Sequence, residues 1–188
     1  DLSLRDGNVV VADYQTAGRG CGTNSWESER GKNLLFSMIL HPSDVLASQQ
    51  FILSMANALA LRDALADYVD DVKIKWPNDI YWKDSKICGT LIETTLKGNH
   101  ISDCIIGTGL NVNQRMFHSD APNPVSLWQI TGQETDREQL LKDILQRLDS
   151  GGGSKNRYMQ MLYRRKGFHP YTDKNGVFMA QITGVEND

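Results

Sequence analysis

The chain has 188 residues, a formal net charge of −3 and a hydrophobic fraction of 40%. This length allows one sizeable core and at most a small appended module. The acidic balance argues against nucleic acid as a partner, because neutralising phosphates requires a surplus of Lys and Arg. No apolar run approaches the roughly 20 residues that span a bilayer, so no membrane association is expected. The cysteines Cys21, Cys88 and Cys104 form no CxxC pair, which predicts a cytoplasmic protein without disulfides or a zinc site.

The first third of the chain predicts two strands, a glycine-rich loop and a helix. Residues 9–12 form a short apolar run typical of a buried strand, and residues 32–40 predict another. Between them, residues 13–26 carry three alternating glycines around Arg19, a pattern that allows close approach of a ligand and suits an anion. The spacing fits neither a Walker loop nor a dinucleotide fingerprint, and a flexible surface loop is the alternative interpretation.

A helix is predicted after Pro42, with Ser43 as its N-cap. Its core-facing residues recur near a 3.6-residue period and are Ile52, Met55, Leu59, Ala66 and Val69. Its solvent face is expected to carry Arg62, Asp63 and Asp67.

Residues 72–93 (VKIKWPNDIYWKDSKICGTLIE) predict three strand segments separated by turns. Val72 and Ile74 alternate with lysines, as in a half-buried strand, and the following Pro, Asn and Asp favour a turn. Polar and charged groups gather at both corners, which indicates a site at one end of a sheet. A solvated hairpin rim is the alternative.

The second half predicts more strands and then helices. Residues 97–99 turn the chain between two β-prone runs, and residues 107–113 (GTGLNVN) are interpreted as a turn that allows a ligand to approach, or as a structural bulge. Residues 135–138 have capping-box spacing before a helix that turns Leu141, Ile144, Leu145 and Leu148 inward. Residues 151–154 are a flexible break before a short helix, and residues 178–182 alternate as a strand. Strands grouped rather than alternating with helices predict an α+β fold with a mixed, largely antiparallel sheet packed with helices.

Four segments together resemble the biotin protein ligase family, the biotin–[acetyl-CoA-carboxylase] ligases. Residues 15–26 resemble the family's glycine-rich biotin and adenylate loop, and residues 75–79 (KWPND) match a family signature. Residues 86–93 (KICGTLIE) and 107–113 (GTGLNVN) are similar to two further family motifs, in the same order and spacing. The resemblance covers most of the chain, from Val9 to about Arg165.

The resemblance implies a catalytic domain over residues 1–165 with the class II synthetase-like biotin/lipoate ligase fold. Residues 166–188 would then begin a small C-terminal SH3-like β module. The chain has no initiating Met, and we expect truncation at both ends. The implied reaction is ATP-dependent: biotin is converted to biotinyl-5′-AMP and transferred to a lysine of the biotin carboxyl carrier domain of acetyl-CoA carboxylase. Mg²⁺ is the implied cofactor, and a homodimer is common in the family.

The resemblance also implies roles for individual residues. Catalysis would fall to Lys86, bridging biotin's carboxylate and the α-phosphate, and to Arg19, which would hold anionic oxygens as the loop closes. Asn78 and Asp79 would lie near the phosphates and Mg²⁺, with Asp79 as the candidate metal ligand. The residues implied to bind biotin or the adenylate are Gln15, Gly18, Gly20, Trp26, Gly89 and Asn111; among them, Trp26 and Asn111 would lie at the adenine.

Two departures from the family pattern matter. The Ser-Thr-Asn biotin-pocket motif is missing upstream of the first predicted strand. Cys21 and Gly22 stand where relatives often carry Arg or Gln and another residue, which predicts weaker retention of the adenylate. Two alternative functions are a lipoate–protein ligase, which would lack KWPND, and a non-catalytic module that senses biotin or its adenylate.

Overall fold

Alternating apolar residues assemble six segments into one antiparallel sheet in the computed structural model, which describes residues 7–119, 121–151 and 154–186. The spatial order is β1-β4-β8-β7-β6-β5, and every neighbouring pair is antiparallel. The strands are β1 (Asn8–Ala12), β4 (Leu34–Leu40), β5 (Val72–Lys75), β6 (Asp79–Trp82), β7 (Ser85–Lys97) and β8 (His100–Leu110).

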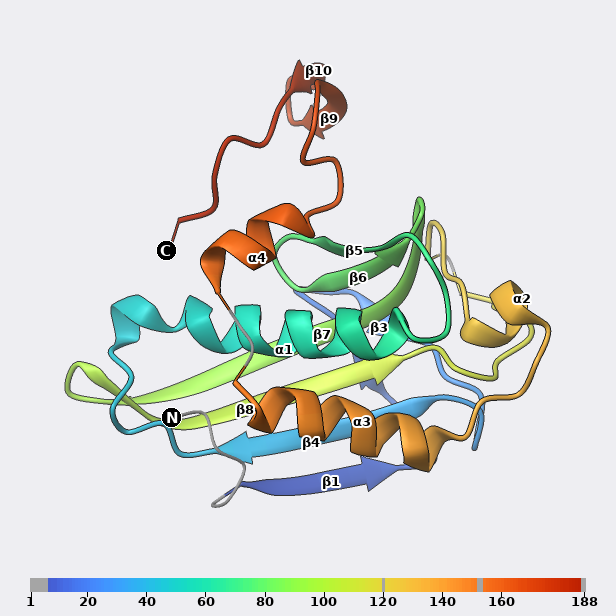
Figure 1. Cartoon of the computed structure of the whole chain (residues 1–188), viewed down its shortest axis with the longest axis horizontal. Coiled ribbons are helices and arrows are strands. Elements are labelled where there is room, and N and C mark those ends of the chain that lie inside the picture. Colours follow the sequence, from blue (N-terminus) through green and yellow to red (C-terminus); the bar gives the residue numbers. More distant parts are fainter. Residues whose placement is uncertain (1–6, 120, 152–153, 187–188) are drawn as a thin grey trace.

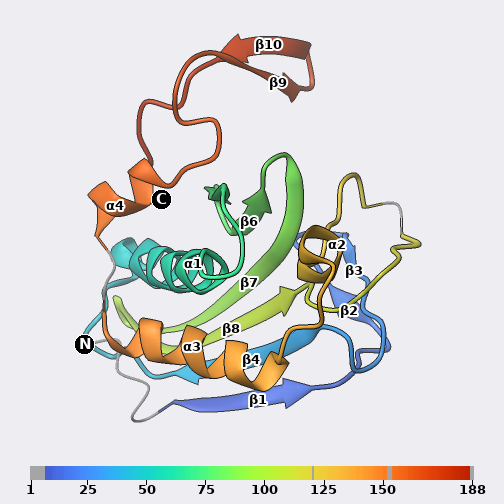
Figure 2. The ribbon, with the colours of Figure 1, turned by 45° about the vertical axis from the view of Figure 1, so that its right-hand side comes forward.

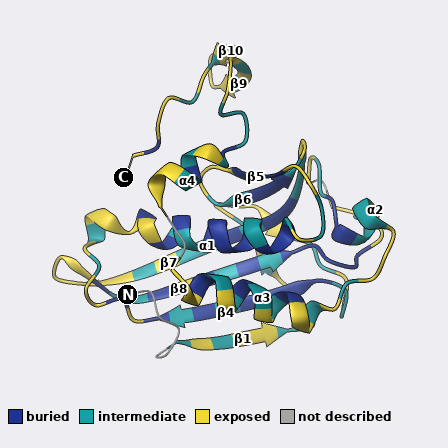
Figure 3. Cartoon of the chain, in the orientation of Figure 1, coloured by how far each residue is buried: buried dark blue, intermediate teal, exposed yellow. Residues whose placement is uncertain are grey.

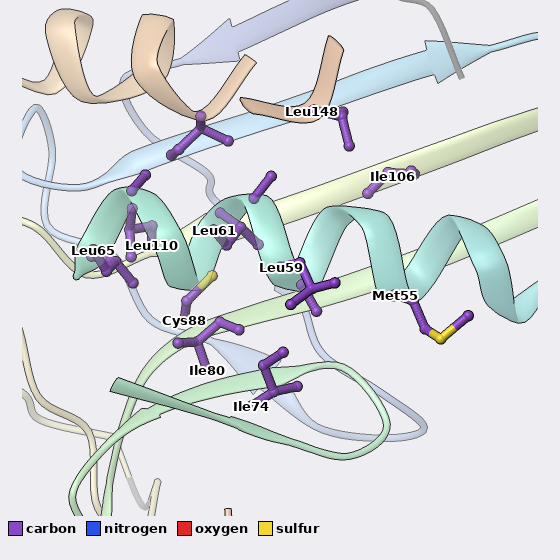
Figure 4. Close-up of a cluster of buried hydrophobic side chains, with 14 of the residues drawn as sticks. Met55, Leu59, Leu61, Leu65, Ile74, Ile80, Cys88, Ile106, Leu110 and Leu148 are labelled. Carbon is purple, nitrogen blue, oxygen red and sulfur yellow. The ribbon is translucent and has the colours of Figure 1, made fainter. Parts of the chain in front are cut away.

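Two helices cover one face of this sheet, α1 (Phe51–Leu65) and α3 (Arg137–Asp149) (Figures 1 and 2). The core lies between them and the strands, where Leu61, Ile106 and Cys88 are among the fully buried side chains (Figures 3 and 4). Because strand side chains alternate between faces, their neighbours Gly89 and Gly107 point to the opposite face. None of the helices in the described ranges is long and apolar enough to cross a membrane.

The smaller elements lie around this framework. Residues Ala47–Gln49 form a 3-10 turn before α1, and two short helices, α2 (Leu127–Thr131) and α4 (Lys155–Gln160), flank α3 in the chain. β2 (Gly18–Arg19) pairs with β3 (Ser25–Trp26), and β9 (His169–Asp173) pairs with β10 (Gly176–Ala180). The β9–β10 hairpin lies apart from the large sheet (Figures 1 and 2). Its assignment to a separate module stays a prediction.

The predicted α+β class with a largely antiparallel sheet is confirmed, but several local predictions were wrong. The 9–12 strand is not buried: β1 lies at the edge of the described sheet, and Val10 is 57% exposed. Gly107 to Leu110 are not a turn but the last residues of β8, paired with both β4 and β7. The two irregularities of register lie elsewhere, at Ile80/Tyr81 and Thr95/Leu96.

The helix boundaries also differ from the prediction. α1 begins at Phe51, several residues after Ser43, because the 3-10 turn intervenes, and Ile52 is exposed. The cap of α3 is Asp136, whose carboxylate accepts the backbone N–H groups of Glu138 and Gln139. Asp63 is not on a solvated face, since it pairs with Arg62 and with Arg157. Gly152 and Gly153 of the predicted flexible break lie outside the described residues.

Candidate active site

The site lies on the face of the sheet turned away from α1, in a cavity of about 1050 Å³. Its floor is formed by β7 and β8, where Gly89 and Gly109 are directly opposite each other. One wall comes from the glycine-rich segment and another from the residues that follow β8. This volume is that of a site for a small organic ligand of nucleotide size.

Lys86 lines this cavity from the second position of β7. Its Nζ lies 2.8 Å from Asp79 Oδ1 and 5.7 Å from the centre of the Trp26 ring. Its backbone is fixed on both sides: its N–H donates to the carbonyl of Asn123 at 2.8 Å, and its own carbonyl accepts from Val125 at 2.9 Å. A lysine held in this way presents a fixed positive charge to an anionic ligand.

The indole of Trp26 rests on the two floor glycines. A Cβ built on Gly109 would lie 2.5 Å from Trp26 Cε2, and one on Gly89 would lie 3.0 Å from Trp26 Cζ3. These glycines are needed because any side chain would displace the ring. The Nε1 of Trp26 is buried without a hydrogen-bond partner among the described residues.

The glycine-rich segment contains a short hairpin. Gly18 pairs with Trp26, and the Gly20 N–H donates to the Asn24 carbonyl at 2.7 Å. A Cβ on Gly18 would lie 2.4 Å from the Trp26 carbonyl oxygen, so this glycine serves the hairpin and is absent from the cavity lining. Gln15, Arg19 and Gly20 do line the cavity.

Arg19 is the exposed cation of the site. Its Nη2 lies 3.6 Å from Glu93 Oε2, and the two side chains are 73% and 53% exposed. An exposed pair at this distance contributes little to stability, so Arg19 is free to exchange Glu93 for an anionic ligand.

The Trp76–Asp79 turn contributes an acid and a structural amide. Asn78 donates its side-chain amide to the Thr90 carbonyl and accepts the Thr90 N–H on its own carbonyl at 3.0 Å. These two bonds lock the turn to β7 and set the position of Asp79, which faces Lys86. Within the described ranges, no three His, Cys, Asp or Glu side chains gather as a metal-binding cluster.

Asn111 follows β8, lines the cavity and is buried. Its amide nitrogen donates to the Val125 carbonyl at 3.1 Å, whereas its Oδ1 is buried without a partner among the described residues. An unpaired buried acceptor is costly, and a ligand donor such as the exocyclic amine of a purine would satisfy it.

Sequence reasoning missed two groups that hold the site. The sequence predicts only core packing for the helix that carries Ser54 and Asn57. In the structure, Ser54 Oγ donates to the Pro77 carbonyl at 3.2 Å, and Asn57 donates to Thr90 Oγ1 at 3.2 Å. Their i, i+3 spacing was the available signal, since it places both on one helix face. Glu27 and Gln114 carried no signal, because they are 87 residues apart in the sequence.

The thiol behind the floor is not reactive. Cys88 is fully buried beside Gly89 on the helix-covered face, and this burial, followed by the nearby Asp79 carboxylate, raises the pKa of its thiol far above the usual range. Cys21 is exposed on the hairpin turn.

Comparison with known proteins identifies the family. Residues 2–111 match the profile of the Biotin/lipoate A/B protein ligase family, which is more than half of the chain. The chain belongs to this family. A "Bifunctional ligase/repressor BirA" of Salmonella typhimurium is 32% identical over 174 residues, covering 91% of this chain and 51% of the relative. A "Biotin--[acetyl-CoA-carboxylase] ligase" of Mycobacterium tuberculosis is 30% identical over 149 residues, covering 77% of this chain and 54% of the relative.

A solved structure agrees with this membership. The biotin protein ligase of Aquifex aeolicus in complex with biotin and ATP superposes with a TM-score of 0.78 at 26% identity, over 95% of this chain and 78% of that one. The predicted resemblance to biotin protein ligases and the predicted fold are thereby confirmed. The chain spans about half the length of the curated relatives described above.

Proposed function

We propose that the protein is an ATP-dependent biotin–protein ligase. One observation carries the proposal: the fixed cation Lys86 stands beside Asp79, over Trp26, in a cavity lined by all four family motifs. The relatives named as biotin ligases and the Aquifex aeolicus complex with biotin and ATP support the choice of substrates. KWPND at residues 75–79 favours biotin over lipoate.

In the first step a carboxylate oxygen of biotin attacks the α-phosphorus of ATP. The new P–O bond forms as the bond to pyrophosphate breaks, giving biotinyl-5′-adenylate. Two anions must approach, so the main demand on the protein is to position them and to neutralise charge. Lys86 meets this demand where the two substrates join, and Arg19 leaves Glu93 to bind anionic oxygens as the hairpin closes over them.

Asp79 is the residue in the site that would bind Mg²⁺. Mg²⁺ is commonly held by one or two carboxylates together with substrate phosphates, so a single acid is sufficient. When bound, the ion neutralises phosphate charge. Asp79 would hold it while still orienting Lys86, and Asn78 maintains the turn.

In the second step the amine of an acceptor lysine attacks the acyl carbon of the adenylate. An amide bond forms, AMP leaves and the amine loses a proton. We propose the biotin carboxyl carrier domain of acetyl-CoA carboxylase as the acceptor, in line with the name of the Mycobacterium tuberculosis relative. Until transfer, the hairpin over the cavity would shield the hydrolysable anhydride from water.

Incubation of the protein with biotin, ATP, Mg²⁺ and a carrier domain tests this proposal. Biotin should become linked to the carrier lysine, while lipoate in place of biotin should give no product, as measured by mass spectrometry. Modification with lipoate alone would contradict the proposal. Binding of biotin without modification would favour the sensing module.

A further inference from the structure

The carboxylate of Glu27 joins two walls of the cavity that are far apart in sequence. Glu27 follows Trp26 and lines the same cavity. The backbone N–H of His118 donates to both of its oxygens at 3.0 Å, and the N–H of Ser119 donates to Oε2 at 2.6 Å. The side-chain amide of Gln114 donates to Oε1 at 3.0 Å.

Gln114 forms the rigid half of this junction. It is 1% exposed, and its Oε1 accepts the backbone N–H of Glu29 at 3.0 Å and the amide of Asn33 at 2.6 Å. Its own carbonyl accepts the hydroxyl of Ser126 at 2.6 Å. Gln114 is therefore held by buried bonds on several sides, and it fixes the Glu27 carboxylate.

The position of the 117–119 wall depends strongly on the Glu27 carboxylate, whereas Gln114 is also held by other hydrogen bonds. In the described part of the chain, the hydrogen bonds made by residues 117–119 all run to the Glu27 carboxylate. Phe117 and Ser119 line the cavity. Without the carboxylate, two adjacent backbone donors would lose their acceptor and the wall would lose its attachment to the Trp26 strand.

A carboxylate at the rim of a cavity for anions would ordinarily repel the ligand. Here its oxygens are occupied by N–H donors. Burial raises the pKa of Glu27, but the hydrogen bonds from Ser119 and His118 outweigh burial and hold this pKa below its ordinary value. The charged form is thus the one that the wall stabilises.

We propose that Glu27 is a positioning residue for the nucleotide, holding the 117–119 wall in place against the adenosine of ATP. This inference rests on the proposed function. The family resemblance implies that the purine binds at Asn111, whose Oδ1 is buried without a partner among the described residues. Asn111 lines the same cavity as Phe117 and Ser119, and the segment that carries the wall follows it in the chain. Biotin, by contrast, is expected beside Gln15 and Gly89.

The test compares Glu27→Ala and Glu27→Gln with wild type in biotin-dependent exchange of pyrophosphate into ATP. Glu27→Ala should raise KM for ATP about tenfold or more, as expected when charge-assisted hydrogen bonds are lost, with KM for biotin and kcat within about twofold. Glu27→Gln should be intermediate, because its Oε1 still accepts an N–H. Glu29→Ala is the matched control: Glu29 lies in the same segment, is exposed, and its carboxylate bonds to none of the described residues.

An unchanged KM for ATP, or an equal rise in both KM values, would overturn the inference. If wild type catalyses no exchange, the proposed function fails separately, and calorimetric titration with ATP then decides the role of Glu27. Roughly tenfold weaker ATP binding by Glu27→Ala, with an intermediate loss in Glu27→Gln, would still support it. Equal affinity, or no binding by wild type, would overturn it.

Discussion

Lys86 and Asp79 face each other across β6 and β7, with Nζ 2.8 Å from Oδ1. The side chains are 33% and 17% exposed, so the pair is partly withdrawn from water. Both residues are fixed independently of the pair, Lys86 by the 123–125 segment and Asp79 by the Asn78 turn. The acid therefore aims a cation whose backbone is already held, a preorganisation suited to charge that develops during a reaction.

Replacing Lys86 by Ala should lower kcat for adenylate formation by about 10²- to 10³-fold, the usual effect of removing a group that stabilises transition-state charge. Biotin affinity should fall much less, because the charge matters most in the transition state. Rapid-quench kinetics and equilibrium titration with biotin measure the two effects. Lys83→Ala is the control, since Lys83 lies over Trp82 outside the cavity and should behave as wild type. Equal losses in rate and affinity for Lys86→Ala would contradict this role.

Gly109→Ala should displace the Trp26 indole, because the new Cβ would lie 2.5 Å from the ring. We expect kcat/KM to fall by about 100-fold, as misplacement of a substrate by about 1 Å can cost that much, while the circular dichroism spectrum and thermal transition are retained. Gly107→Ala, two residues earlier on the same face, meets neighbours only at 3.7 Å and should remain active. If Gly109→Ala were as active as Gly107→Ala and wild type, the position of the indole would be unimportant.

Cys21→Arg should slow the release of biotinyl-adenylate. Cys21 lies on the exposed hairpin turn and lines the cavity, where a guanidinium would add a charge-assisted bond to the phosphate. Such a bond predicts about tenfold slower release. Filtration of the preformed complex followed by quantification of free adenylate measures the rate. Cys21→Ser, which adds no charge, is the control, and equal rates for all three proteins would refute the expectation.

The lowered pKa of Glu27 predicts a pH-dependent contribution to stability. A carboxyl group whose pKa is lower in the folded than in the unfolded state stabilises the fold above its unfolded pKa, and this contribution is lost as pH falls through the folded value. The Tm of wild type should therefore exceed that of Glu27→Gln near neutral pH, and the difference should shrink in mildly acidic buffer as pH drops to about 4 and below. Differential scanning calorimetry across this range measures it. A difference independent of pH would exclude the carboxylate's charge as the cause.

Much of the fold was predictable because local patterns decide it. Val72, Ile74 and the residues of β4 alternate or cluster as strands do, and the structure places them in one sheet. The edge position of β1 was not predictable, because an apolar run such as 9–12 is compatible with a central, buried strand and with an exposed edge strand. The start of α1 was misplaced because Ser43 is a residue type that often caps helices, whereas the helix begins only after the 3-10 turn, with Gln50 at its N-cap position.

The candidate site was likewise predictable only in part. Lys86, Asp79, Trp26 and Asn111 line one cavity, as the resemblance of their motifs predicted, although Trp26 belongs to the small β2–β3 hairpin and not to the large sheet. Gly18 pairs with Trp26 in the hairpin and does not line the cavity, so its role in ligand binding stays a prediction. The Glu27–His118 link could not be predicted, because its acceptors and donors belong to segments joined only by tertiary structure.

The most direct test of the central claim is exchange of labelled pyrophosphate into ATP by the intact protein. We predict exchange that requires both biotin and Mg²⁺ and that is strongly reduced in Lys86→Ala. Exchange that proceeds without biotin, or an absence of exchange in protein that binds biotin, would contradict the assignment of this chain to biotin activation.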